Sequence, residues 1–175
     1  GNLSAGGLTT GHSNTILGAV SGANIQTGNY NIAVGVDALE GAYFMSGSSN
    51  IAIGQAAQAT VSTGSYNIAI GSEALRYNTT GTNNVAIGQQ AYGANASGTT
   101  GRENTAVGFQ ALYFAGNASY STALGHGALY RVTGNDNTGI GTDAGNTITS
   151  GTNDTCIGHD AQASSATVSN EITLG

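Results

Sequence analysis

The chain has 175 residues, of which 29 are glycine, and it contains no proline, no tryptophan and one cysteine. Hydrophobic residues make up 39% of it, which excludes a disordered linker, and the absence of proline excludes collagen. Three basic against nine acidic residues give a net charge of −6, so we expect no nucleic-acid partner. One cysteine excludes an internal disulfide framework, and no apolar run approaches the roughly 18 residues of a membrane span, so no membrane insertion is expected either.

An eight-residue pattern recurs along the chain: Asn, any residue, a small residue, an aliphatic residue, Gly, two variable residues and Ala. It reads NIAVGVDA from Asn31 and NIAIGQAA from Asn50, and weaker copies stand near both ends. The glycine after the aliphatic residue recurs in steps of 17, 19, 17, 17, 20, 17, 16, 17 and 17 residues, at Gly18, Gly35, Gly54, Gly71, Gly88, Gly108, Gly125, Gly141, Gly158 and Gly175. This period predicts a solenoid of about ten 17-residue coils. We expect a lead-in over residues 1–13 and one repeat domain over 14–175, as part of a longer fibre.

Each copy of the pattern predicts one short strand, because its aliphatic residues alternate with a small one. The expected strands are residues 31–35, 50–54, 67–71, 84–88, 104–108, 121–125, 137–141 and 154–158, in chain order. The glycine at the end of each strand would supply a corner with positive φ, and a Thr-Gly or Ser-Gly pair three residues before the Asn would supply a second turn. We expect the repeated Asn to stack with its copies as an amide ladder.

The fold class is therefore all-β, a parallel β-solenoid or β-roll, with coils about 4.8 Å apart and a rod of roughly 45 Å. One narrow coil cannot fill both its aliphatic face and its small-residue face, so one of these faces should meet other chains. We expect a homo-oligomer, and a homotrimeric rod fits one apolar side per chain. The residues assigned to the oligomer contact or to the core of the roll are Ile32, Val34, Ile51, Ile53, Ile68, Ile70, Val85, Ile87, Val107, Leu124, Ile140 and Ile157.

The second position of the repeated pattern changes along the rod. It is Ile or Val in the first half and becomes threonine at Thr105, Thr122, Thr138 and Thr155. The sequence interpretation is that half of the core strip turns hydroxylated, which predicts a slimmer or partly hydrated C-terminal half.

The N-x-A-(I/V)-G-x-x-A repeats resemble the head repeats of trimeric autotransporter adhesins, which implies a left-handed parallel β-roll with three chains side by side. With their T-G-x-x-N punctuation they also resemble shaft or receptor-binding regions of bacteriophage tail fibres. The ending from Ser169 to Gly175 is similar to the junction that precedes a self-cleaving chaperone domain in such fibres. The resemblance covers residues 10–175 and implies adjoining fibre domains and a downstream chaperone domain as partners. Adhesin heads use shorter units than 17 residues, which favours the phage branch.

Two insertions break the period, in residues 40–46 and 92–97, and should loop out. Aromatic residues concentrate after the strand, where exposed tyrosines beside Asn and Ser can stack on sugar rings. The alternative is that these rings pack against a neighbouring chain. The candidate ligand-binding residues are Tyr43, Phe44, Tyr77, Tyr92, Tyr113, Phe114 and Tyr130.

Polar candidates for chemistry are few. Asp143 and Asp160 hold the same position in adjacent coils, which permits a weak calcium site or a glycosidase-like carboxylate pair, although solvated corner residues are the simpler interpretation. His126 and His159 share a column two coils apart, too far for one metal. Cys156 should be a buried, inert thiol. We expect no cofactor and no catalysis.

The leading function is a structural and receptor-binding segment of a phage tail fibre in the virion tail, which attaches to a host cell-surface glycan or protein. The alternative is a trimeric autotransporter adhesin head on a bacterial surface. An ice-binding solenoid, suggested by the threonine column, and a tailspike glycanase, suggested by the aspartates, rank lower.

Overall fold

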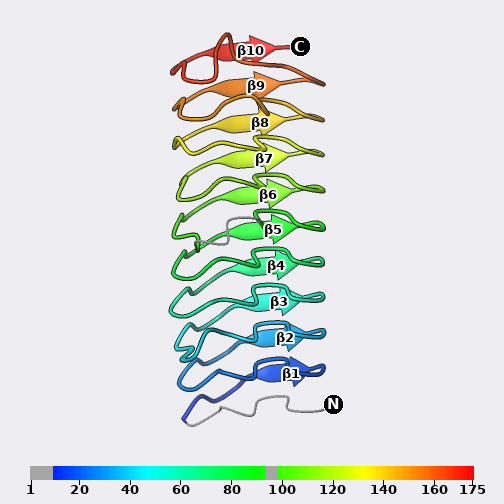
Figure 1. The fold of residues 1–175 in the computed structure, drawn as a ribbon, viewed down its shortest axis with the longest axis vertical. Helices are drawn as coiled ribbons and strands as arrows, with labels where there is room; N and C mark the ends of the chain where they lie inside the picture. The colour runs from blue at the N-terminus through cyan, green and yellow to red at the C-terminus, as the bar shows by residue number, and fades with distance from the viewer. Residues whose placement is uncertain (1–9, 94–97) are drawn as a thin grey trace.

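The computed structural model describes residues 10–93 and 98–175 as one parallel β-solenoid. Its ten strands stack in chain order, with the C-terminus at the top of the rod in Figure 1. This confirms the all-β solenoid of about 17 residues per coil. The strands are β1 (Thr15–Leu17), β2 (Ile32–Val34), β3 (Ile51–Ile53), β4 (Ile68–Ile70), β5 (Val85–Ile87), β6 (Thr105–Val107), β7 (Thr122–Leu124), β8 (Thr138–Ile140), β9 (Thr155–Ile157) and β10 (Ile172–Leu174).

The register places each repeat directly over the next. Ile51 pairs with Ile68 and Ile53 with Ile70, and the same correspondence holds through both insertions. Since every strand is paired in parallel with its neighbour, backbone N–H groups are used at each coil, as in the bond from Ile51 N to Asn67 O at 2.8 Å. Proline has no N–H to give to such a ladder, which accounts for its absence.

The core of the coil lies between the small middle residue of each strand and a column of leucines in the returning segment. The middle residues, from Ala33 to Cys156, are fully buried. A Cβ built on Gly139, the one glycine among them, would lie 2.8 Å from Leu129 Cγ, so the leucines reach the strand directly. The larger core side chains are Leu39, Leu75, Leu112 and Leu129, with Ile25, Met45, Val61, Val132 and Ile148 beside them.

Glycine columns mark both turns of the coil, for different reasons. At the corner after the strand, Gly35 has φ +134°, and a Cβ there would lie 2.6 Å from the carbonyl oxygen of Gly54 in the next coil. At the Thr-Gly turn, Gly64 has no such φ, but its Cβ would lie 2.7 Å from Gly81 O. Close approach between coils therefore favours glycine at both turns, although Ala118 takes this position at the second turn of one coil, and the predicted corners are confirmed.

The repeated Asn forms the expected amide ladder. Asn67 Oδ1 accepts a hydrogen bond from the backbone N–H of Asn84 at 3.0 Å, and Asn67 Nδ2 donates to Gly81 O at 2.9 Å. Both bonds reach the following coil, so each buried amide ties two coils together. Equivalent bonds recur at Asn31, Asn50, Asn84, Asn104 and Asn137.

Asp154 takes the asparagine position in the ninth strand's coil, and one of its oxygens has no partner. Oδ1 accepts from Glu171 N at 2.9 Å, but Oδ2 is buried without a hydrogen bond. Asp154 Oδ2 lies beside Gly151. In the coil of Asn84, the amide Nδ2 lies in the same position beside Gly81. An amide there would supply a donor where the carboxylate offers only an acceptor.

We therefore predict that Asp154→Asn raises the free energy of unfolding by about 1–2 kcal/mol at pH 7. Urea denaturation followed by circular dichroism measures this change. Asp136→Asn is the matched control, because it removes the same charge from an exposed turn residue and should change stability by less than about 0.5 kcal/mol. Equal effects of the two substitutions would contradict the ladder argument.

Part of the sequence prediction falls outside the described residues: residues 1–9 of the expected lead-in and 94–97 of the second insertion. The first insertion is described, and it does loop out, with Tyr43 89% and Phe44 70% exposed while Met45 is buried. Within 10–93 and 98–175 the structure has no helix long and apolar enough to cross a membrane.

Candidate binding surfaces

The aliphatic residues at the first and third positions of the strands lie on the outer face of the sheet. In β2 to β9 the middle residue is buried, whereas Ile53 is 38% and Ile87 38% exposed. These side chains are therefore not the core of the roll, and that half of the prediction is wrong. The physical reason is space, because the leucine column fills the interior and leaves room only for a small side chain on the strand. Their other predicted role, contact with neighbouring chains, stays a prediction.

The same finding relocates the threonine row. Thr105, Thr122 and Thr138 are paired in register on the outer face, half-buried, beside the aliphatic row. The change from isoleucine to threonine therefore alters the outer face of the sheet, and the prediction of a hydroxylated core strip is wrong. The buried core of the C-terminal half remains apolar, with Leu129, Val132 and Ile148.

Three of the predicted aromatic residues form one cluster on the returning segments of the sixth and seventh strands' coils. The ring centroids of Tyr113 and Tyr130 are 5.4 Å apart in a stacked arrangement, and Phe114 packs edge-on against both. We call Tyr113, Phe114 and Tyr130 the aromatic cluster. Burial raises the pKa of the Tyr113 phenol, which therefore stays protonated and neutral at physiological pH.

Tyr77 lies apart from those ring contacts and has Arg76 over its ring, with the guanidinium carbon 5.2 Å from the centroid. Tyr43 and Phe44 are exposed on the first insertion. Of the seven predicted aromatic residues, the structure thus brings together three.

Tyr92 is buried, so its assignment to the surface is wrong. Its ring is 1% exposed, and Asn104 Nδ2 donates to its hydroxyl at 3.2 Å. Burial raises the pKa of this phenol strongly. The reason is register, since Ala91-Tyr92 follows the strand as Ala74-Leu75 does, which places Tyr92 in the leucine column. That spacing was the signal in the sequence.

Sequence reasoning missed a second set of exposed tyrosines, each immediately before the ladder position. Tyr30 is 62% and Tyr66 64% exposed, and Tyr120 accepts a hydrogen bond from Arg102 Nε at 2.9 Å. All three have positive φ, so the left-handed turn directs them outward. The available signal was the Tyr-Asn or Tyr-Ser pair at the start of three copies.

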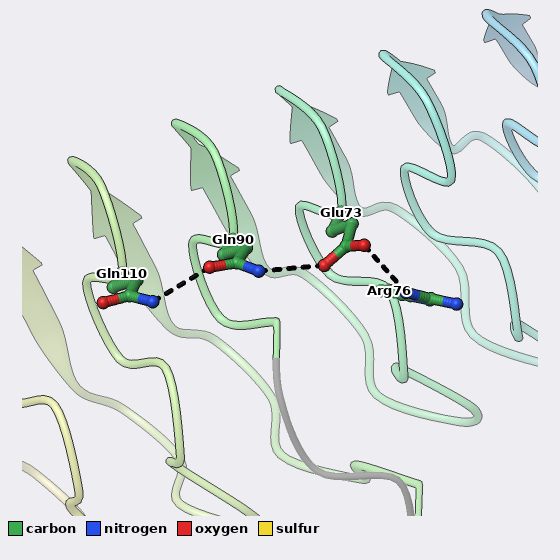
Figure 2. Close-up of polar contacts among 4 residues, drawn as sticks. All are labelled: Glu73, Arg76, Gln90 and Gln110. Carbon is green, nitrogen blue, oxygen red and sulfur yellow. Dashed lines mark hydrogen bonds and ion pairs between the residues drawn. The ribbon is translucent and has the colours of Figure 1, made fainter.

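A polar row runs across three coils beside these surfaces (Figure 2). Gln110 Nε2 donates to Gln90 Oε1 at 2.9 Å, and Gln90 Nε2 donates to Glu73 Oε2 at 3.0 Å. The other carboxylate oxygen of Glu73 pairs with Arg76 Nη1 at 2.8 Å. The row therefore satisfies Arg76 within the protein.

The two candidate aspartates each have a histidine neighbour. His126 Nδ1 lies 3.7 Å from Asp143 Oδ1, and His159 Nδ1 lies 3.3 Å from Asp160 Oδ2. Among residues 10–93 and 98–175 there is no group of three or more His, Cys, Asp or Glu side chains arranged to hold a metal ion. Cys156 is fully buried as predicted, and burial raises its pKa, which disfavours the reactive thiolate.

One pocket of about 400 Å³ adjoins the aromatic cluster. It is lined by Tyr130, Arg131, Asn146, Thr147 and Thr149. Tyr130 and Arg131 come from one coil, and the other three residues come from the returning segment of the next coil. The pocket therefore opens on the side of Tyr130 that faces away from the coil of Tyr113.

Comparison with known proteins found no match to this chain among protein-family models, curated proteins or solved structures.

Proposed function

We propose that this chain is a structural and receptor-binding segment of a bacteriophage tail fibre, which assembles as a homotrimer and attaches to a host cell-surface glycan without catalysis. The observation that carries the proposal is the long outer face of aliphatic side chains on a straight ten-strand sheet. Nine steps of about 4.8 Å make this face roughly 45 Å long. Apolar patches beyond several hundred Å² are rare on soluble monomers and mark contact surfaces.

The rest of the molecular surface supports attachment. Tyr43, Phe44 and Phe114 are exposed, and the aromatic cluster stands on the returning segments, away from the strands. In a trimer that covers the strand faces, these segments would point outward. Rigid amphipathic rings with Asn and Thr neighbours suit the apolar faces and hydroxyls of sugars.

The trimeric autotransporter adhesin head remains the second candidate, because its repeats have the same pattern. The sequence that flanks this chain separates the two. A downstream coiled coil and outer-membrane anchor would favour the adhesin, and a self-cleaving chaperone domain would favour the phage fibre.

Light scattering with size-exclusion chromatography tests the assembly. We predict a mass three times the 17.2 kDa of one chain. A monomer at micromolar concentration would overturn the trimer proposal and leave the outer face without its proposed partner.

Attachment needs a separate test. A fluorescent fusion of the protein should adsorb to some members of a panel of bacterial strains that differ in capsule and lipopolysaccharide. Removal of surface glycan by periodate should abolish this adsorption. Adsorption to no strain would reduce the proposed function to that of a spacer.

A further inference from the structure

The pocket beside the aromatic cluster combines a ring, an unpaired cation and side-chain amide and hydroxyl groups. We propose that it binds a carboxylated sugar residue, with Arg131 on the carboxylate and Tyr130 under the sugar ring. This inference rests on the proposed function and specifies the class of glycan that the segment recognises.

Arg131 is the first ground for an acidic ligand. The chain has three basic residues. Arg76 pairs with Glu73 at 2.8 Å, and Arg102 donates to the Tyr120 hydroxyl at 2.9 Å. Arg131, within the described part of the chain, has no ion pair or hydrogen bond and lies exposed, with its guanidinium carbon 5.9 Å from the Tyr130 centroid. Its planar fork is therefore free to take a carboxylate in a bidentate contact.

No acidic side chain within residues 10–93 and 98–175 forms an ion pair with Arg131. The carboxylate of Asp143, from the coil that completes the pocket, contacts a residue of the preceding coil instead, with Oδ1 3.7 Å from His126 Nδ1. Figure 2 shows the contrasting case of Arg76, whose charge is already taken up by Glu73. The two arginines each lie over a tyrosine, but one of them is neutralised and the other is available.

Tyr130 is the second ground, because its ring is held by two rings of the preceding coil and the residue also lines the pocket. Tyr113 from the preceding coil stacks on it at 5.4 Å, and Phe114 packs edge-on at 5.4 Å. In the following coil the shorter Asn146 succeeds Tyr130, which ends the aromatic stack and leaves the space of about 400 Å³. A pyranose ring placed there would continue the stack.

The remaining lining residues offer groups for sugar hydroxyls. Thr147 Oγ1 donates to Gln162 Oε1 at 2.8 Å, and Thr149 Oγ1 donates to Ala166 O at 3.0 Å. Each hydroxyl oxygen can still accept a hydrogen bond, and the half-exposed Asn146 amide can both donate and accept. The set therefore matches a sugar that carries one carboxylate and several hydroxyls.

Isothermal titration calorimetry with four probes tests this inference on the intact protein. The acidic probes are trigalacturonate and 3′-sialyllactose, and the neutral counterparts are trigalacturonate methyl ester and lactose. We expect at least one acidic probe to bind about tenfold or more tightly than its neutral counterpart, with weaker binding as salt rises. Binding of trigalacturonate alone assigns a hexuronate, and binding of sialyllactose alone assigns a nonulosonate.

Variants locate the binding. Arg131→Gln should weaken the acidic probe about tenfold and reduce its preference over the neutral one, and Tyr130→Leu should weaken both. Arg102→Gln is the matched control, since it removes the same charge from beside Tyr120 and should bind as the parent does. Equal affinity for acidic and neutral probes, or unchanged binding by Arg131→Gln, would overturn the inference. If the fusion adsorbs to cells while none of the probes binds, the pocket inference fails and the proposed function stands.

Discussion

Replacing Gly125 by alanine should destabilise the solenoid by about 3–5 kcal/mol, which is a large effect for one methyl group. Gly125 has φ +136°, a backbone region that residues with a Cβ rarely adopt. The added Cβ would also collide with the carbonyl oxygen of Gly141 in the next coil. Because that collision is with backbone, it can be relieved only by separating two coils and weakening the hydrogen bonds between them.

Gly127→Ala is the matched control, two residues away in the same coil. Gly127 has φ +62°, and Ala56 occupies the equivalent position at φ 52°. The added Cβ would meet only the Asp143 carboxylate, which ends a half-exposed side chain and can move. We expect a cost of at most about 1–2 kcal/mol. Urea denaturation of both variants measures the difference, and equal losses would contradict the argument from the collision between the two backbones.

The coil period could be predicted from sequence because glycine recurs at the positions where the backbones of adjacent coils come close together. Gly35, Gly54 and Gly71 stand wherever a corner carbonyl of one coil meets the corner of the next, so their spacing measures the coil directly. The register of the strands follows from the same spacing. The insertion that contains Tyr43 was visible for the same reason, as an excess over the period.

The direction of the two strand faces could not be predicted in this way. Alternation along Ile51-Ala52-Ile53 shows that the strand has two different faces, but it does not determine which face points to the interior. Hydrophobicity alone favours the isoleucines for the interior. The decision rests on volume, because Leu39 and Leu75 enter the coil from the opposite side and only alanine fits between them and the strand.

The binding surfaces were predictable only as far as they are local in sequence. Tyr113 and Phe114 are adjacent, and a returning segment that exposes one brings both near Tyr130 in the next coil. The exposed cation was not predicted, because it depends on the absence of a carboxylate partner for Arg131. Arg76 and Arg131 each stand next to a tyrosine in the sequence, and the difference between them is the Glu73 carboxylate three residues before Arg76.

A charge placed on the outer sheet face should dissociate the proposed trimer while leaving each coil folded. Ile87 is one of the two outward residues of β5 and is 38% exposed, with Ile70 and Val107 beside it on the neighbouring strands. In Ile87→Asp a single chain would present the carboxylate to water at little cost. In a trimer that buries this face, three carboxylates would be desolvated near one another, which costs several kcal/mol. We expect the dissociation constant to rise at least about 1000-fold, or about 4 kcal/mol.

Tyr66→Asp is the control for this substitution, because Tyr66 is 64% exposed at a turn, where its φ of 60° suits aspartate. It introduces the same charge and removes an exposed ring from outside the sheet face, so the trimer should persist. Sedimentation velocity gives the mass of each variant, and far-ultraviolet circular dichroism shows whether the β-structure is retained. If Ile87→Asp stays trimeric, the subunits meet through another surface, and the aliphatic face must be covered by a different partner. If it becomes monomeric with its β-structure intact, the leucine column and the asparagine ladder suffice to fold one chain, and the outer aliphatic rows serve assembly.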